Sequence, residues 1–248
     1  MGREIYPAMT GGARALKALD VLSNNLANVN TTGFKADRAA FTLHAPDGAA
    51  NGDESEQRLA NAWASLDGMH TDFTQGSLQE TGSASHLALT GLGFFQLEAE
   101  GTVGGVELTR DGSFQVDAEG ILVSRSGQAV LSDKGEPLQV GHAGFEIDEQ
   151  GKVRVDGQDR GRIAVADVTE IERLHKVAGN RFQLAEGQKV TVVGGSLQQF
   201  HLEGSNVSPV DSLTQMIALS RYYESFQKSL ETSSDLDSQL NTVGHIDR

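Results

Sequence analysis

The sequence predicts an α+β fold with two terminal amphipathic α-helices that pair as a coiled coil and a β-rich central domain of hairpins or a barrel-like sheet. Both ends of the chain repeat apolar residues at alternating steps of three and four, which indicates the helices. Between the ends, short apolar runs are separated by glycine, of which the chain has 29 against 4 prolines, and this indicates short strands and tight turns. We therefore expect an N-terminal helix at 1–35, a linker or extended segment at 36–84, a β-rich domain at 85–200 and a C-terminal helix at 201–248.

The N-terminal helix is predicted by an apolar stripe with steps of 4, 3, 4 and 3. This spacing places the stripe on one narrow face of a helix over about 5–30, which is typical of helix–helix packing and narrower than a helix needs to cover a sheet. Gly33 can adopt the left-handed conformation that ends such a helix. The expected seam residues are Ala15, Leu19, Leu22, Leu26 and Val29.

The segment 45–70 is rich in Ala, Gly, Asp and Glu and is predicted to be a solvated linker, with a short packed helical turn near Trp63 as the alternative. Strand-like runs follow as far as about residue 200. Within them, FQVDAEGILV at 114–123 is echoed by FEIDEQGKVR at 145–154. Each copy predicts a strand, an Asp-x-x-Gly turn and a second strand, so the pattern indicates one β-hairpin used twice.

The C-terminal helix has a clear predicted start. Ser208 is expected to cap the helix N-terminus, Pro209 suits the first helical position, and Asp211 places an acidic residue at the third. Apolar residues then repeat at steps of 3, 4, 3 and 4, and Gly244 is expected to end the helix. The seam residues of this helix are Met216, Leu219, Tyr223, Phe226 and Leu230.

Composition argues against several classes of function. The net charge of −14 is unsuited to nucleic acid or an anionic membrane surface, and no apolar run approaches the roughly 18 residues of a membrane span, so we expect neither as a partner. The first 20 residues lack the apolar stretch of a cleavable secretory signal. The chain has no cysteine, its seven histidines lack metal-ligand spacing, and no nucleophile or phosphate-loop motif is present. We expect no catalytic residue, no cofactor and no metal site.

Three segments resemble motifs of the flagellar basal-body rod and hook protein family. LDVLSNNLANVNTTGFK at 19–35 resembles its N-terminal signature, and GLGFFQL followed by ELTRDGSFQVDAEGILV resembles its middle motif. LEGSNVSPVDSLTQMIALSRYYESFQKSLETSSD resembles its C-terminal helix. Within the family, the length and the segment 71–89 most resemble the proximal rod members. A distal rod or hook-type subunit is the alternative, and a periplasmic β-domain enzyme or carbohydrate-binding module is the remote one.

The resemblance implies a structural, non-enzymatic subunit of the periplasmic rod in the flagellar basal body, which polymerises into a helical axial structure that transmits torque. It implies that other copies of the chain and related rod proteins are partners, contacted through the terminal helices, and that the chain passes through the flagellar type III export apparatus. From the residues alone, the two helices could instead cover one face of the sheet or pair as an ordinary hairpin.

The asparagines in and near the terminal helices need a separate explanation, because asparagine is a mediocre helix former. In a tube of packed helices, amide side chains can satisfy buried polar groups and fix the register between subunits. The residues for which we expect this inter-subunit polar role are Asn24, Asn25, Asn28 and Asn206.

Overall fold

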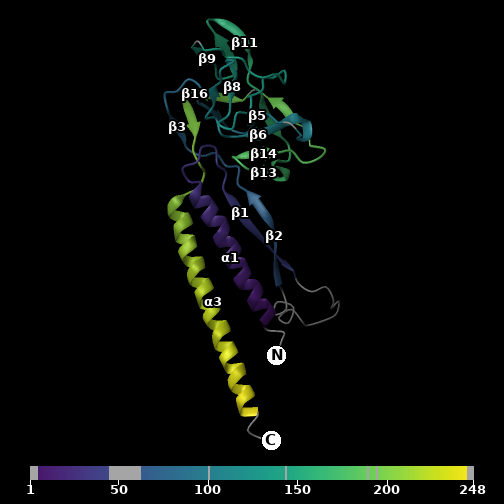
Figure 1. Cartoon of the computed structure of the whole chain (residues 1–248), viewed down its shortest axis with the longest axis vertical. Coiled ribbons are helices and arrows are strands. Elements are labelled where there is room, and N and C mark those ends of the chain that lie inside the picture. The colour runs from purple at the N-terminus through teal and green to yellow at the C-terminus, as the bar shows by residue number, and fades with distance from the viewer. Residues whose placement is uncertain are drawn as a thin grey trace. The chain divides into compact units, whose positions relative to one another are not determined.

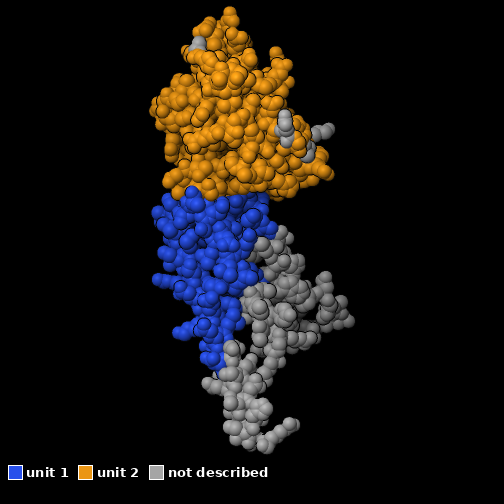
Figure 2. Space-filling view, viewed as in Figure 1, with its two compact units in different colours: residues 1–27, 37–71, 208–248 blue, residues 28–36, 72–207 orange. Residues whose placement is uncertain are grey.

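The computed structural model describes residues 5–44, 63–99, 101–142, 144–188, 190–193 and 195–244. The chain divides into two compact units (Figure 2): unit 1 comprises residues 1–27, 37–71 and 208–248, and unit 2 comprises residues 28–36 and 72–207. This division differs from the four regions predicted. The expected linker at 36–84 contains strands and is shared between the two units.

Unit 1 consists of two helices and a two-stranded ribbon: α1 (Ile5–Ala27), α3 (Pro209–Gly244), β1 (Asp37–His44) and β2 (Trp63–Thr71). Helices α1 and α3 lie side by side, and α1 also contacts the ribbon (Figure 1). The strands are antiparallel, with a bulge between Ala40 and Phe41. The predicted linker is therefore wrong from Trp63 onward, since Trp63 begins β2 and no helical turn forms there. Residues 45–62 lie outside the described part of the chain.

The helix limits follow the sequence signals closely at one end of the chain and less closely at the other. Helix α3 runs from Pro209 to Gly244, as predicted. Helix α1 ends at Ala27, before the predicted end near residue 30, and the backbone N–H of Thr31 then donates to the carbonyl of Asn28 at 3.1 Å. Gly33 has a positive φ of 65°, but it lies in the turn beyond the helix and not at its cap.

Unit 2 is built on a six-stranded antiparallel sheet in the order β13 (His175–Val177), β14 (Arg181–Gln183), β6 (Val106–Thr109), β5 (Phe94–Glu98), β12 (Val165–Val168), β15 (Val190–Val193). A three-stranded sheet joins β11 (Gln158–Arg162), β10 (Lys152–Val155) and β9 (Phe145–Ile147). Three ribbons pair β16 (Ser196–Gln199) with β4 (Leu87–Thr90), β17 (His201–Glu203) with β3 (Leu78–Glu80), and β7 (Gln115–Val116) with β8 (Leu122–Val123). Short 3₁₀ helices occur at Val103–Gly105 and Ile171–Arg173.

The described strands of unit 2 form open sheets, so the barrel-like version of the prediction is wrong. The six-stranded sheet has two different edge strands, β13 and β15, and these do not pair with each other. Strands of two to five residues, each bounded by turns, produce several small sheets in place of one continuous surface that could close. The α+β class and the hairpin-rich character of the middle are confirmed.

Two buried clusters meet at strand β5. Phe95 belongs to the larger cluster and contacts Phe114 edge to face, with ring centroids 5.1 Å apart. Phe94, the preceding residue, belongs to the other cluster and contacts Phe182 at 5.7 Å. Successive side chains of a strand point to opposite faces. Strand β5 is therefore covered on both sides, and it lies in the middle of the core.

The predicted repeat forms the same turn in both copies. In the first, Asp117 Oδ1 accepts the backbone N–H groups of Glu119 and Ile121 between β7 and β8. In the second, Asp148 Oδ1 accepts those of Gln150 and Lys152 between β9 and β10. The turn glycines, residues 120 and 151, have φ of 79° and 81°. The hairpin prediction is confirmed in both places: in each turn the aspartate accepts backbone N–H groups and the glycine adopts a positive φ.

Gly120 of the first turn provides both a positive φ and room for the backbone of Gly141, and these two requirements can be tested separately. Gly120 and Gly127 both have positive φ, but a Cβ on Gly120 would lie 2.8 Å from Gly141 Cα, whereas one on Gly127 would meet nothing within 4 Å. Both alanine variants incur about 1–2 kcal/mol of backbone strain. We expect Gly120→Ala to lower the free energy of unfolding of unit 2 by about 1 kcal/mol more than Gly127→Ala does. Hydrogen exchange over unit 2 peptides measures the difference, and equal effects would contradict the close packing.

Candidate assembly site

The predicted seam residues lie in the two helices that pack together in unit 1, with one exception. Ala15 is buried, and eight further seam residues are half-buried. Val29 lies in the turn after α1 and belongs to unit 2, so its place on the helical seam is corrected. The half-buried seam residues are Leu19, Leu22, Leu26, Met216, Leu219, Tyr223, Phe226 and Leu230.

A glycine that the sequence analysis passed over allows α1 and α3 to approach closely. An ideal Cβ built on Gly12 would lie 3.0 Å from Phe226 Cε1 and 3.8 Å from Tyr223 Cε2. Gly12 is buried, and the aromatic rings of α3 therefore occupy the space that a side chain would fill. Two adjacent glycines inside an apolar helical pattern are the signal for such a contact, because glycine costs helix stability and is kept where something packs against it.

A second apolar stripe on α3 remains exposed. Val210, Leu213 and Ile217 have 71%, 46% and 56% of their surface accessible. Their spacing of three and four places them along one face of the helix, distinct from the face that carries Phe226 and Tyr223. The sequence analysis missed this stripe because it counted one apolar face per helix.

The start of α3 has the local geometry that its sequence predicts. The hydroxyl of Ser208 accepts the backbone N–H of Asp211 at 3.4 Å, and the Ser208 carbonyl accepts the N–H of Ser212 at 3.0 Å. Pro209 is the first residue of the helix. The helix therefore begins at a fixed point, immediately before the exposed stripe.

Asn25 uses its amide inside unit 1. Its Nδ2 donates to the carbonyl of Asp37 at 2.8 Å, and its Oδ1 accepts the N–H of Asp37 at 2.9 Å. Asn25 is buried, and this pair of bonds attaches the end of α1 to the first residue of β1. The amide therefore bonds within the chain, and the inter-subunit role expected for it stays a prediction.

Asn206 and Asn28 also bond within the chain. Asn206 Oδ1 accepts the N–H of Ala36 at 2.8 Å, and its Nδ2 donates to the carbonyl of Asp72 at 2.8 Å, so it joins three segments of unit 2. Asn28 Oδ1 accepts the hydroxyl of Thr31 at 3.2 Å, within the turn after α1. For Asn206 and Asn28, as for Asn25, the inter-subunit role stays a prediction. Asn24 lies exposed on α1.

The segment 28–36 is held in unit 2 by Gly33 and Phe34. A Cβ on Gly33 would lie 2.4 Å from the backbone nitrogen of Asp111, so this contact and the positive φ both require glycine. The N–H of Gly33 donates to the carbonyl of Glu203 at 2.8 Å. Phe34 is buried, and Lys176 Nζ lies 4.1 Å from the centroid of its ring.

A buried carboxylate joins the beginning, the middle and the end of unit 2. Glu203 Oε1 accepts Lys35 Nζ at 2.6 Å and the N–H of Gly76 at 2.9 Å, and Oε2 accepts Arg110 Nη1 at 3.3 Å. The side chains of Lys35 and Glu203 have no accessible surface. Burial lowers the pKa of Lys35, while its hydrogen bond and charge attraction to Glu203 act in the opposite direction, and burial also lowers the pKa of Arg110. The sequence analysis missed this cluster, since isolated charged residues usually lie at the surface.

The charge cluster predicts an order of mutational effects. Glu203→Gln removes the shared carboxylate and leaves two buried cations facing each other, so we expect the free energy of unfolding of unit 2 to fall by about 3–5 kcal/mol. Lys35→Met keeps the pair between Glu203 and Arg110 and should cost about 1–3 kcal/mol. Hydrogen exchange over unit 2 peptides measures both. A smaller loss in Glu203→Gln than in Lys35→Met would contradict the central role of the carboxylate.

Asn25 gives a separate prediction for unit 1. Asn25→Ala leaves the N–H and carbonyl of Asp37 without their partner, and we expect unit 1 to lose about 2 kcal/mol. Ser23→Ala, at an exposed position of the same helix, is the control and should change stability by less than about 0.5 kcal/mol. Urea unfolding followed by the fluorescence of Trp63 is suitable, because the single tryptophan and all three tyrosines belong to unit 1. Equal stabilities of the two variants would refute the role of Asn25.

Neither a membrane span nor a metal site is found in the described part of the chain. None of its helices combines the length and the apolar character needed to cross a bilayer. Over the same residues, His, Asp and Glu side chains do not gather in threes at distances suited to a metal ion.

Three family models match successive parts of the chain. The model "Flagella basal body rod protein" matches residues 5–35, "Flagellar hook protein FlgE/F/G D1 domain" matches 88–155, and "Flagellar basal body rod FlgEFG protein C-terminal" matches 198–243. Each match contains one member of the buried charge cluster: Lys35, Arg110 and Glu203, in that order.

Curated relatives match over nearly their whole length. The flagellar basal-body rod protein FlgF of Caulobacter vibrioides is 32% identical over 99% of this chain and 100% of the relative. FlgG of Bacillus subtilis is 31% identical over 97% of this chain and 98% of the relative. FlgG of Agrobacterium fabrum is 30% identical, with coverages of 95% and 97%.

Proposed function

The chain belongs to the flagellar basal-body rod protein family, and we propose that it is a proximal rod subunit that stacks through its terminal helices α1 and α3. Membership makes it a structural protein of the basal-body rod that assembles with related rod proteins, and not an enzyme. The proximal position rests on the likeness to FlgF over the full length. The proposal that subunits stack through the helices is supported by the exposed apolar side chains on α3.

The exposed stripe on α3 carries the proposal. Three large apolar side chains at the start of a helix are unusual for a surface that stays in water. Fully burying each one is worth about 1.5–3 kcal/mol, so a neighbouring helix that covers Val210, Leu213 and Ile217 gains substantially. In the complete rod, we expect the seam face and this second face of the helices to pack as coiled-coil surfaces.

The contact that we propose joins two different surfaces. A stripe on α3 that meets another face of the next subunit is a heterologous contact, and such contacts propagate as an open helix. This is the geometry that an axial structure needs to transmit torque along its length. Asn24, exposed on α1, keeps the proposed role of fixing register between subunits, and we propose the flagellar export apparatus as a further partner before assembly.

The stripe can be tested apart from the fold of the helix pair. Ile217→Asp places a charge in the proposed contact without touching the packing of Phe226 on Gly12, and we expect incorporation into rods to fall at least about tenfold. Immunoblots of basal bodies isolated from cells that express only the variant measure incorporation, and swimming in soft agar reports motility.

Two further variants complete this experiment. Ala218→Asp adds the same charge at an exposed neighbouring position off both apolar faces, and it should incorporate normally. Phe226→Asp should lower both the stability of unit 1 and incorporation, because Phe226 packs on Gly12. Normal rods and motility in Ile217→Asp cells would refute the stripe as an assembly surface.

A further inference from the structure

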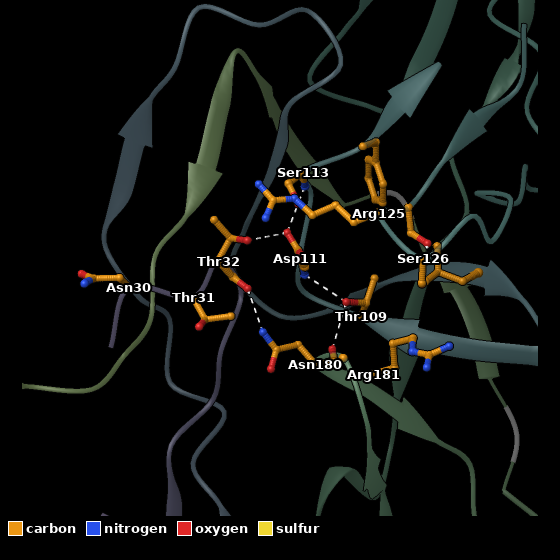
Figure 3. Close-up of a pocket in the computed structure, with 14 residues that line it drawn as sticks. Asn30, Thr31, Thr32, Thr109, Asp111, Ser113, Arg125, Ser126, Asn180 and Arg181 are labelled. Carbon is orange, nitrogen blue, oxygen red and sulfur yellow. Dashed lines mark hydrogen bonds between the residues drawn. The ribbon is translucent and has the colours of Figure 1, made fainter. Parts of the chain in front are cut away.

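Unit 2 contains a pocket of ≈ 360 Å³ whose walls come from five separate segments, one of which contributes Leu97 of β5 (Figure 3). Thr32 belongs to the segment after α1, and Asp111 and Ser113 follow β6. Arg125 lies in the turn after β8, and Asn180 precedes β14. Neither α1 nor α3 contributes to it, so the pocket is independent of the helical surfaces.

The walls are tied to one another by hydrogen bonds. The hydroxyl of Thr32 donates to Asp111 Oδ1 at 2.7 Å, and Asn180 Nδ2 donates to the carbonyl of Thr32 at 3.1 Å (Figure 3). The hydroxyl of Thr109 donates to the carbonyl of Asn180 at 3.0 Å. The pocket is therefore preformed, and a ligand would not have to order these segments.

Two charged residues that line the pocket, Arg181 and Asp111, already have hydrogen-bond partners within the chain. Arg181 Nη1 donates to Glu107 Oε2 at 2.8 Å and to Gln128 Oε1 at 2.6 Å. Burial raises the pKa of Glu107, but hydrogen bonds from Gln128 and Gln183 and the charge of Arg181 outweigh it, so that pKa is lowered and the carboxylate stays charged. Asp111 Oδ1 accepts two donors, the hydroxyl of Thr32 and the N–H of Ser113.

Among the described residues, the side chains of Arg125 and Ser113 at this pocket have no partner. Arg125 is exposed, and its guanidinium forms no hydrogen bond or ion pair with them. Ser113 is only 3% exposed, and its hydroxyl has no hydrogen-bond partner there. A buried hydroxyl without a partner costs about 1–3 kcal/mol, so a polar ligand group that reaches Ser113 would gain a hydrogen bond there.

We propose that this pocket binds a carboxylate, which Arg125 pairs with its guanidinium and Ser113 with its hydroxyl. A guanidinium offers two parallel N–H donors that match the two oxygens of a carboxylate, and a hydroxyl adds a third donor. The carboxylate has two possible sources, an aspartate or glutamate of a neighbouring subunit or a free organic acid. The chain has 34 Asp and Glu residues, so a neighbouring copy offers many carboxylates that could enter the pocket.

Binding is tested on the full chain with succinate as the probe and neutral succinamide, at matched ionic strength, as the control. We expect succinate to shift the NMR amide signals of Thr32, Ser113, Arg125 and Asn180 saturably. Its dissociation constant should rise at least about fivefold in Arg125→Gln and in Ser113→Ala. Arg160→Gln, which removes an exposed arginine outside the pocket, should bind like the wild type. An absent or non-saturable shift, an equal shift with succinamide, or wild-type binding by Arg125→Gln would overturn the proposal.

The source of the carboxylate is tested by cross-linking. The chain has no cysteine, so Ser126→Cys provides a unique thiol beside the pocket for a photoreactive cross-linker. A cross-link to an acidic peptide of a second copy that succinate suppresses would support the site and identify a neighbouring subunit as the source. Succinate binding without such a cross-link would support the site and assign it to a free acid. A chain that binds succinate but does not need Ile217 for rod entry would refute the helical stripe and leave this site standing.

Discussion

The carboxylate of Glu203 is the interaction on which unit 2 depends. It lies near the end of the unit, yet its partners are Lys35 at the beginning, Arg110 in the middle and the backbone of Gly76. Removing three charged side chains from water is costly, and the arrangement is stable only because each finds an opposite charge or a donor. Arg110 extends the network, since its Nη2 donates to the carbonyl of Gly91 at 2.6 Å and its guanidinium lies over Phe94. The network thus joins the segment after α1 to the central strand of the sheet.

This arrangement connects residues from the three segments that the family models match. In the first motif, Thr32 donates a hydrogen bond to Asp111 and Gly33 packs against the backbone of Arg110 and Asp111. Lys35 of the same motif donates to Glu203. Glu203 of the third accepts both cations. One residue from each of the three matched segments therefore belongs to a single buried charge cluster within unit 2. Helix α3 of unit 1, by contrast, exposes the apolar side chains of Val210, Leu213 and Ile217.

Local signals predicted local structure well. The two Asp-x-x-Gly turns, the start of α3 at Pro209 and its end at Gly244 each depend on a few adjacent residues, and all are observed. The strands β1 and β2 were not predicted individually within the extended segment expected at 36–84, because each finds its pairing partner only beyond an 18-residue gap in sequence. The buried charges were missed for a related reason. Nothing near Lys35 in the sequence reveals that a carboxylate 168 positions later will meet it.

The pairing of β3 with β17 and of β4 with β16 has a kinetic consequence. Both ribbons join the first strands of unit 2 to its last ones, so they require closure of loops longer than 100 residues. Folding rates fall as contacts become less local, which makes this unit a slow folder compared with a helical bundle of similar size. A chain emerging from the ribosome cannot complete the unit until residue 203 has been made. Until then β3 lacks its partner β17, although the strands of the six-stranded sheet, the last of which ends at Val193, can already pair.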